Sequence, residues 1–167
     1  MFEIIEGNVN LVHMNIRLEK RGDESVQACD LSFLWETNNG ALAMFAPELR
    51  HCLYKAADGA QLELATDPDH LTALRFPHMG PIKWTGGELI GGELNFHYGV
   101  KSEIAVEIKK LHKFRLECKE GGTVAIGFQV QCLPTEQQIG KFSMFLAAGT
   151  CTLSVTPPAA KADDDQP

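Results

Sequence analysis

A strict alternation of apolar and polar residues runs through the stretch from Leu94 to Cys132. The apolar sets are Leu94/Phe96/Tyr98, Ile104/Val106/Ile108, Phe114/Leu116/Cys118 and Val124/Ile126/Phe128/Val130/Cys132. A spacing of two residues places one face of a β-strand in a core and the other face in water. The stretch therefore predicts an antiparallel sheet with one buried face and one solvated face.

Two more alternating segments near the N-terminus predict a β-hairpin. Their apolar sides are Val12, Met14, Ile16 and Leu18 in the first segment and Cys29, Leu31, Phe33 and Trp35 in the second. The polar residues 20–24 between them include Gly22, which is typical of a turn. We expect both apolar sides to face the core.

Helical spacing in the first half of the chain is confined to short segments. The segment Asn38-Asn39-Gly40 offers a cap for a first helix over about 40–45, and a second helix is expected over about 47–55. Pro47 separates them, because proline is tolerated only at the start of a helix. A single helical turn is predicted from Asp67 through Leu74.

The C-terminal part predicts one longer helix and a final strand. Thr135, followed by Gln138 three residues later, forms a capping-box pattern. Gly149 suits a left-handed cap at the other end of the helix. The alternating residues 151–155 predict a short strand.

Together these elements predict the α+β class, with an antiparallel, β-rich sheet or partly closed barrel of about seven strands and two or three short helices. A five-stranded oligonucleotide-binding barrel is one such form, although seven strands are more than it has. Residues 1–158 are expected to form a single globular α+β domain. Residues 159–167 contain no large apolar side chain, so we expect a disordered acidic C-terminal tail.

Size and composition suit an ordinary globular protein, with 167 residues of which 44% are hydrophobic. The chain contains no apolar run close to the roughly 20 residues that cross a bilayer as a helix. Glu3 and Glu6 stand where a signal peptide would carry basic residues. We therefore expect no membrane association and a cytoplasmic location.

The cysteines predict a reduced protein. Four of the five cysteines fall on the apolar side of a strand pattern, as expected of small buried hydrophobic residues. They are Cys29, Cys118, Cys132 and Cys151, and the exception is Cys52. Cys118 and Cys132 lie on the flanking strands of one predicted hairpin. A disulfide between them, or a zinc site, therefore remains an alternative.

The charge distribution singles out one candidate binding face. The formal net charge of −7 argues against a bulk grip on duplex DNA. Residues 101–119, however, hold six bases against three acids, a net charge of +3, which leaves −10 for the rest of the chain. Single-stranded nucleic acid is held by cationic grooves and stacking rings. The candidate nucleic-acid-binding residues are Lys101, Lys109, Lys110, His112, Lys113, Arg115 and Lys119, with Trp84 and His97 as additional flat groups.

An ordinary solvated strand face is the alternative interpretation of these bases, because lysines at sheet edges protect against aggregation. The interpretation as a binding face depends on Lys113 and Arg115 pointing into solvent while Phe114 and Leu116 are buried.

The chain carries no local catalytic, metal or nucleotide signature. No Gly-x-Ser-x-Gly elbow is present, and the histidines lack the spacing of metal ligands. Cys52 follows His51 in a predicted helix, where adjacent side chains point about 100° apart. We therefore predict no catalytic residue, metal or cofactor and a non-enzymatic protein. A site dispersed along the sequence stays open, since a catalytic constellation need not be local.

Parts of the chain resemble two known groups of proteins. The tail residues Asp163, Asp164 and Asp165 resemble the acidic tails of bacterial and phage single-strand-binding proteins, although those tails usually end in an aromatic residue and this one ends in Gln166-Pro167. The resemblance implies that the tail recruits partner enzymes and competes with DNA for the basic groove. Residues 74–84 and 120–132 resemble small phage and prophage proteins of unassigned role, often encoded near recombination functions.

These observations predict a non-enzymatic single-stranded DNA-binding or recombination accessory protein, phage-encoded, with single-stranded DNA and recombination proteins as partners. The alternative is a protein-interaction module that binds or inhibits a host protein. The charge of −10 outside the basic stretch and the rigid loop over residues 76–84 favour that alternative. A homo-oligomer is expected in either case, because an exposed sheet edge or this loop makes self-association easy.

Overall fold

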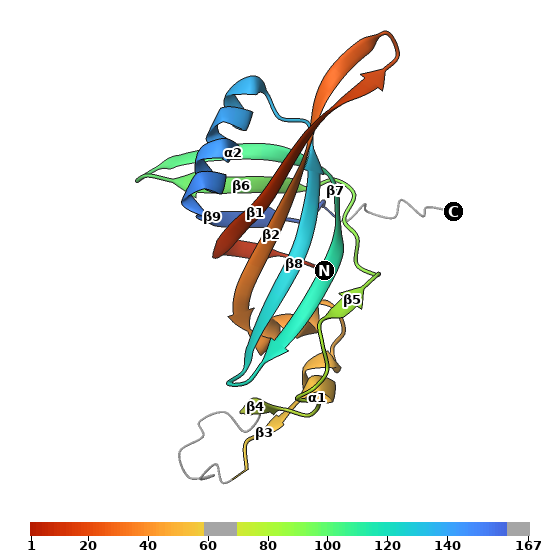
Figure 1. Cartoon of the computed structure of the whole chain (residues 1–167), viewed down its shortest axis with the longest axis vertical. Helices are drawn as coiled ribbons and strands as arrows, with labels where there is room; N and C mark the ends of the chain where they lie inside the picture. The colour runs from red at the N-terminus through yellow and green to blue at the C-terminus, as the bar shows by residue number, and fades with distance from the viewer. Residues whose placement is uncertain (59–69, 160–167) are drawn as a thin grey trace, which may run out of the picture.

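The computed structural model describes residues 1–58 and 70–159. It is an α+β structure in which antiparallel strands dominate and the helices are short (Figure 1). Its elements are β1 (Ile4–Arg21), β2 (Glu24–Asn38), η1 (Asn39–Met44), α1 (Leu49–Leu53), β3 (Tyr54–Ala56), β4 (Leu71–Leu74), β5 (Ile82–Trp84), β6 (Glu93–Tyr98), β7 (Ser102–Lys119), β8 (Thr123–Cys132), α2 (Glu136–Ala148) and β9 (Thr150–Thr156).

Six of the strands close into a barrel. The sheet order is β5-β7-β6-β9-β1-β2-β8, and β7 also pairs with β8, which joins the two ends of the ring. The 18-residue strand β7 makes closure possible, because it pairs with β6 near its start and with β8 along the rest. Strand β5 lies outside the ring and pairs with β7. The predicted β-rich fold of about seven strands with few helices is confirmed.

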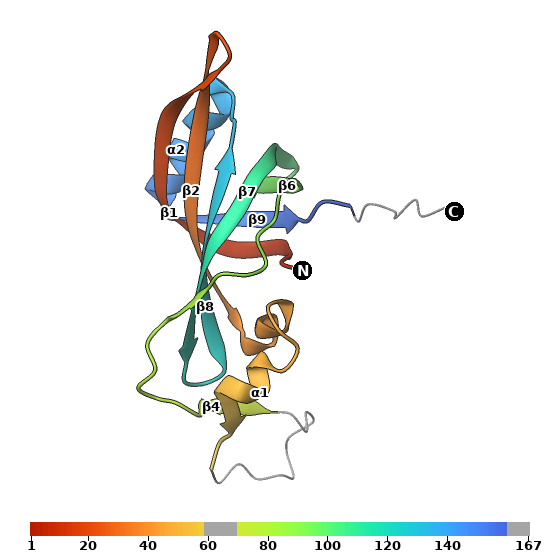
Figure 2. The ribbon, with the colours of Figure 1, turned by 90° about the vertical axis from the view of Figure 1, so that its right-hand side faces the viewer.

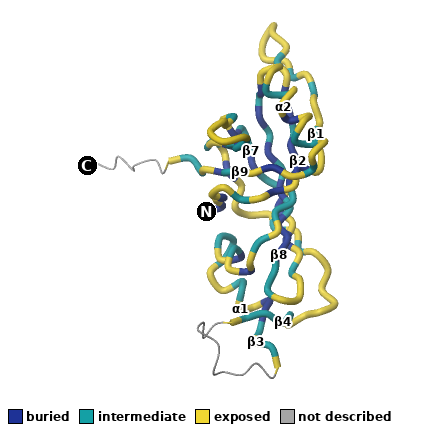
Figure 3. Tube along the Cα trace, turned by 90° about the vertical axis from the view of Figure 1, so that its left-hand side faces the viewer, coloured by how far each residue is buried: buried dark blue, intermediate teal, exposed yellow. Residues whose placement is uncertain are grey.

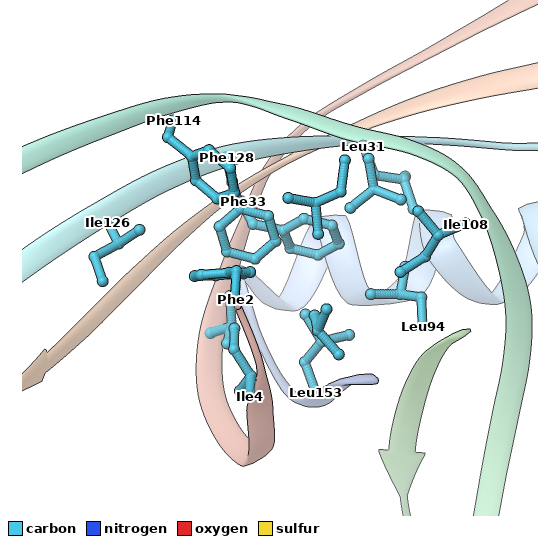
Figure 4. Close-up of a cluster of buried hydrophobic side chains, with 14 of the residues drawn as sticks. Phe2, Ile4, Leu31, Phe33, Leu94, Ile108, Phe114, Ile126, Phe128 and Leu153 are labelled. Carbon is cyan, nitrogen blue, oxygen red and sulfur yellow. The ribbon is translucent and has the colours of Figure 1, made fainter. Parts of the chain in front are cut away.

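The alternating residues of the predicted sheet fill the barrel. Phe33 and Phe128 stack with ring centroids 5.2 Å apart, and Phe2 meets Phe128 edge-on at 5.1 Å. Figure 4 shows these rings together with aliphatic side chains from several strands. Helix α2 covers part of this core, since Phe142 and Phe145 both pack on Phe96 at 4.9 and 5.1 Å.

The hairpin formed by β1 and β2 differs from the sequence expectation. A bulge between Leu11 and His13 shifts the register, so Leu11 is buried while Val12 is 58% exposed. Ile16 and Leu18 are 44% and 72% exposed, because the hairpin extends beyond the barrel (Figures 1 and 2). The prediction that these apolar side chains are buried was therefore wrong. The yellow tip of the tube in Figure 3 marks this exposed arm.

The predicted helices are present with one exception. Asn38 caps η1 by accepting from the Gly40 N–H, and α1 follows as a separate helix. Residues 71–74 form strand β4, which pairs with β3, so the expected helical turn is wrong there, while Asp67 lies outside the described residues.

At the other end of the chain, α2 has the predicted capping box of Thr135 and Gln138 and the cap Gly149, and β9 is the expected final strand. No helix within the described residues is long and apolar enough to span a bilayer. The acidic tail beyond residue 159 lies outside the described residues.

All five cysteines are free. Cys118 lies opposite Val124 and Cys132 opposite Ile108, so the two are not neighbours and form no disulfide. The register partner of Cys132 on β2 is Cys29, and both are buried. Cys151 is also buried, whereas Cys118 is half-buried and Cys52 exposed.

Tyr54 ties the helical segment to the turn between β7 and β8. Its side chain is fully buried. The hydroxyl donates to the Thr123 carbonyl at 2.7 Å and accepts from the Lys119 N–H at 3.0 Å. Burial raises the pKa of Tyr54 well above the ordinary value. The neutral phenol is therefore a structural link between η1–α1 and the barrel.

We expect Tyr54→Phe to lower the free energy of unfolding by about 1–3 kcal/mol, because the buried Thr123 carbonyl and Lys119 N–H lose this partner. Urea denaturation followed by circular dichroism measures this.

The wild type should also lose stability above about pH 10, since the unfolded chain releases the phenolic proton more readily than the folded one. In Tyr54→Phe, the part of the stability loss at alkaline pH that comes from this phenol should be absent. The control is Tyr98→Phe, at the only other tyrosine; an equal loss there would contradict the assignment.

Candidate nucleic-acid interface

The second half of β7 presents basic side chains to solvent above a buried apolar layer. Lys113 and Arg115 are exposed, whereas Phe114 and Leu116 are almost completely buried. The alternation seen in the sequence therefore holds at these four positions. It places the arginine on the outer side of the barrel wall.

A bulge gives Lys113 an unusual backbone conformation. Between His112 and Arg115 the register of β7 against β8 shifts, so β7 contains an extra residue there. Lys113 has a φ of 58°, a left-handed conformation that non-glycine residues adopt only at a cost. Bulges of this kind bend a strand and redirect its side chains. A second register shift lies between Ile108 and Lys110.

Lys83 joins the two cations of β7 across the β5–β7 pairing. It lies directly opposite Arg115 in the antiparallel register and is exposed. On the other side of Arg115, its partner in β8 is Gly127, which has no side chain to cover it. Like charges directly opposite each other destabilise a sheet, so this pairing has an energetic cost. Lys83, Lys113 and Arg115 are hereafter the β5–β7 cation patch.

Sequence analysis did not select Lys83. The available signal was the alternation Ile82-Lys83-Trp84, in which a base lies between two apolar residues. A strand of three residues is too short for alternation alone to identify it. Only the pairing with β7 shows that this lysine lies beside Arg115.

Among the residues that the structure describes, the cation patch differs from the neighbouring bases in having no acidic partner. Three of the predicted residues form ion pairs: Lys109 with Glu107 at 2.8 Å, Lys110 with Glu88 at 3.0 Å and Lys119 with Glu36. Within residues 1–58 and 70–159, no carboxylate forms an ion pair with the cation patch. Its charge is therefore available to an anion.

The two flat groups expected beside these cations are less available. Trp84 is half-buried, pairs in register with the buried Phe114 and meets Phe45 edge-on at 5.9 Å, on the face opposite Lys83. His112 is half-buried next to the bulge. Burial, and then the charges of Lys110 and Lys113, lowers its pKa, so it is neutral at pH 7.

The remaining predicted residues lie elsewhere. His97 is on β6 and Lys101 is in the turn that leads into β7, away from the part of β7 that pairs with β5. Asp163, Asp164 and Asp165 fall outside the described residues. The structure thus brings Lys113 and Arg115 together with Lys83 and separates them from His97 and Lys101.

No protein-family model, curated protein or solved structure matches this chain. The part of the chain that the structure describes contains no group of three or more His, Cys, Asp or Glu side chains placed to hold a metal ion. The assignment of a function therefore depends on the chemistry of the surface itself.

At Lys113 we expect glycine to be more stabilising than alanine by about 1 kcal/mol, because only glycine adopts the left-handed backbone without cost. Denaturation of Lys113→Gly and Lys113→Ala measures the difference. Lys83 lies in a regular strand and is the control position. There the order should reverse, with glycine less stable by about 0.5–1 kcal/mol. The same order at both positions would show that Lys113 is not strained.

Proposed function

We propose that this protein is a single-stranded DNA-binding or recombination accessory protein, phage-encoded, whose β5–β7 cation patch contacts the DNA backbone. The observation that carries the proposal is the exposure of three cations with no acidic partner among the described residues. Phosphate oxygens are the natural partners of such a group, and their approach relieves the repulsion between Lys83 and Arg115.

A single strand suits this patch better than a duplex. The net charge of −7 repels an extended polyanion at a distance, so only a local contact is favourable. A flexible strand can place successive phosphates on a patch of three cations without bringing a second backbone near the acidic surface. Trp84 faces away from the patch, so the contact involves phosphates more than bases and has little sequence preference.

The acidic tail fits the same scheme as a competitor. Asp163, Asp164 and Asp165 form a short run of negative charge near the C-terminus. We infer that it occupies the cation patch in the absence of DNA and becomes available to recombination proteins when DNA displaces it. This role follows the resemblance to the tails of single-strand-binding proteins.

The double variant Lys113→Glu/Arg115→Glu tests the proposal. We expect labelled oligo-dT to bind the wild type at low salt, with a log–log salt slope of about −2 for three phosphate contacts. The double variant should keep its fold but no longer bind. Lys83→Ala should make the salt slope less negative by about 0.7, because one phosphate contact is lost. Fluorescence anisotropy measures both effects.

The matched control is Lys20→Glu/Arg21→Glu, which makes the same change in net charge at exposed positions on the tip of the β1–β2 hairpin. It should bind nearly as well as the wild type. Absence of any anisotropy change at low salt, or an equal loss in the control, would reject the proposed function.

A specific observation also favours the second candidate, a protein-interaction module that binds or inhibits a host protein. In the loop between β4 and β5, Phe76 and Met79 are 56% and 46% exposed. Pro77 and Pro81 restrict this loop, so little conformational entropy is lost when a partner covers it. The same loop would serve the self-association expected of a homo-oligomer.

Native mass spectrometry of Phe76→Ser/Met79→Ser tests this second candidate. We expect the wild type to form oligomers or complexes with a host protein through this loop, and the variant to lose them because the apolar contact is removed. Its oligo-dT binding should be unchanged. If the variant has the same stoichiometry and the same partners as the wild type, the loop is not the interaction surface.

A further inference from the structure

The outer face of the barrel carries a second group of polar side chains, at the start of β7. Glu103 on β7 lies directly opposite His97 on β6. On its other side, His97 lies opposite Thr152 on β9, and Ser154 is two residues further along that strand. Since side chains two residues apart share a face of a strand, Glu103, His97 and Ser154 lie on the same outer surface. Ser154 is far from the other two in the sequence, whereas His97 and Glu103 belong to one hairpin, and all three are adjacent across three paired strands.

The three side chains are connected through the histidine ring. His97 Nε2 lies 2.8 Å from Ser154 Oγ, and His97 Nδ1 lies 3.7 Å from Glu103 Oε2. A hydroxyl on Nε2 and a carboxylate on Nδ1 is the arrangement that activates the nucleophile of serine hydrolases. At 3.7 Å the Glu103 carboxylate is beyond hydrogen-bond distance of Nδ1 and acts on the ring through its charge. The tautomer with its proton on Nδ1 leaves Nε2 to accept the proton of the serine.

The backbone of β1 orients the serine. The Glu6 N–H donates to Ser154 Oγ at 2.9 Å, so the hydroxyl proton of Ser154 is free to point to His97. Glu6 has a φ of 45°, and the β1–β9 register shifts between Ile4 and Gly7. A strained residue in a bulge is found where surrounding structure holds it, often at functional sites. Here it supplies the N–H that contacts the serine.

A groove of about 490 Å³ lies against this group. His97, Glu103, Glu6, Thr152 and Lys101 are among the residues that line it, and Ser154 lies beside it, hydrogen-bonded to two of them. The volume is in the range of small-molecule sites. Lys101, in the turn that leads into β7, brings a positive charge to the groove.

We propose that Ser154, His97 and Glu103 form a serine-hydrolase-type site that cleaves short-chain carboxylic esters. Ser154 is the nucleophile and His97 the general base and acid. Glu103 is a positioning residue that holds the imidazole. The site is separate from the β5–β7 cation patch, so the proposal does not depend on nucleic-acid binding.

The reaction proceeds in two balanced steps. Ser154 Oγ bonds to the ester carbonyl carbon while its proton moves to His97 Nε2. The bond to the leaving oxygen then breaks, and His97 returns the proton to that oxygen, which releases an alcohol and leaves an acyl ester on Ser154. Water loses a proton to His97 and attacks this ester, releasing the carboxylic acid as the proton returns to Ser154. The sum is ester plus water to acid plus alcohol.

Two measurements on the full chain test the proposal. A fluorophosphonate probe should form one adduct, located at Ser154 by mass spectrometry of peptides, and p-nitrophenyl acetate should be hydrolysed. Ser154→Ala should abolish the adduct, and both it and His97→Gln should lower the hydrolysis rate by about 10²–10⁴-fold. Ser143→Ala, at an exposed serine on α2, is the control and should behave as the wild type.

Further variants distinguish catalysis from structure. Glu103→Gln should lower kcat with little change in KM, and Glu103→Asp should restore part of the rate, because a carboxylate is needed to orient the imidazole. Circular dichroism and oligo-dT binding of Ser154→Ala should match the wild type. Lys113→Glu/Arg115→Glu should keep its esterase rate, so failure of one function is distinguishable from failure of the other. Absence of an adduct at Ser154, or wild-type hydrolysis by Ser154→Ala, would overturn the proposal.

Discussion

Closure of the barrel depends on the two different pairings of β7. The strand binds β6 over Ser102–Glu107 and β8 from Ile108 onward, so one long segment joins the two ends of the ring. Each of its backbone bulges falls in the part that pairs with β8, where the strand must bend around the core. Strand β7 thereby completes the barrel wall against which the core aromatic residues and α2 pack. Both candidate sites include residues of β7, with Glu103 near its start and Lys113 and Arg115 in its second half.

The regular parts of the fold could be predicted from the sequence, and the irregular parts could not. The alternation over 94–132 correctly predicted strands, and the capping signals correctly predicted the ends of α2. Both signals depend only on residues close together in the chain. The bulge at Val12 coincides with a change of phase in the apolar alternation, since Leu11 and Val12 are adjacent apolar residues, but such a change alone does not show which of the two is buried. The exposure of Leu18 followed from the hairpin passing the end of the barrel, which is a property of the whole topology.

The candidate sites show the same limit. Lys113 and Arg115 could be placed on an outer face from their immediate neighbours. Their contact with β5 and the ion pairs that neutralise Lys110 and Lys119 needed segments distant in sequence. The meeting of His97 with Ser154 depends on the β6–β9 pairing, which joins strands more than fifty residues apart. Local motif searches do not detect a constellation of this kind.

The extension of the hairpin has a consequence for how this molecule meets others. Within the ring, neighbouring strands satisfy the main-chain amide and carbonyl groups on both sides. Beyond Leu11 on β1 and before Cys29 on β2, the two strands pair only with each other among the described residues, so the sheet leaves their outer edges unsatisfied. A foreign β-strand could extend the sheet at this arm, whereas the rest of the ring offers it little room. The arm thus offers a long open edge for strand addition, in addition to the short outer edge of β5.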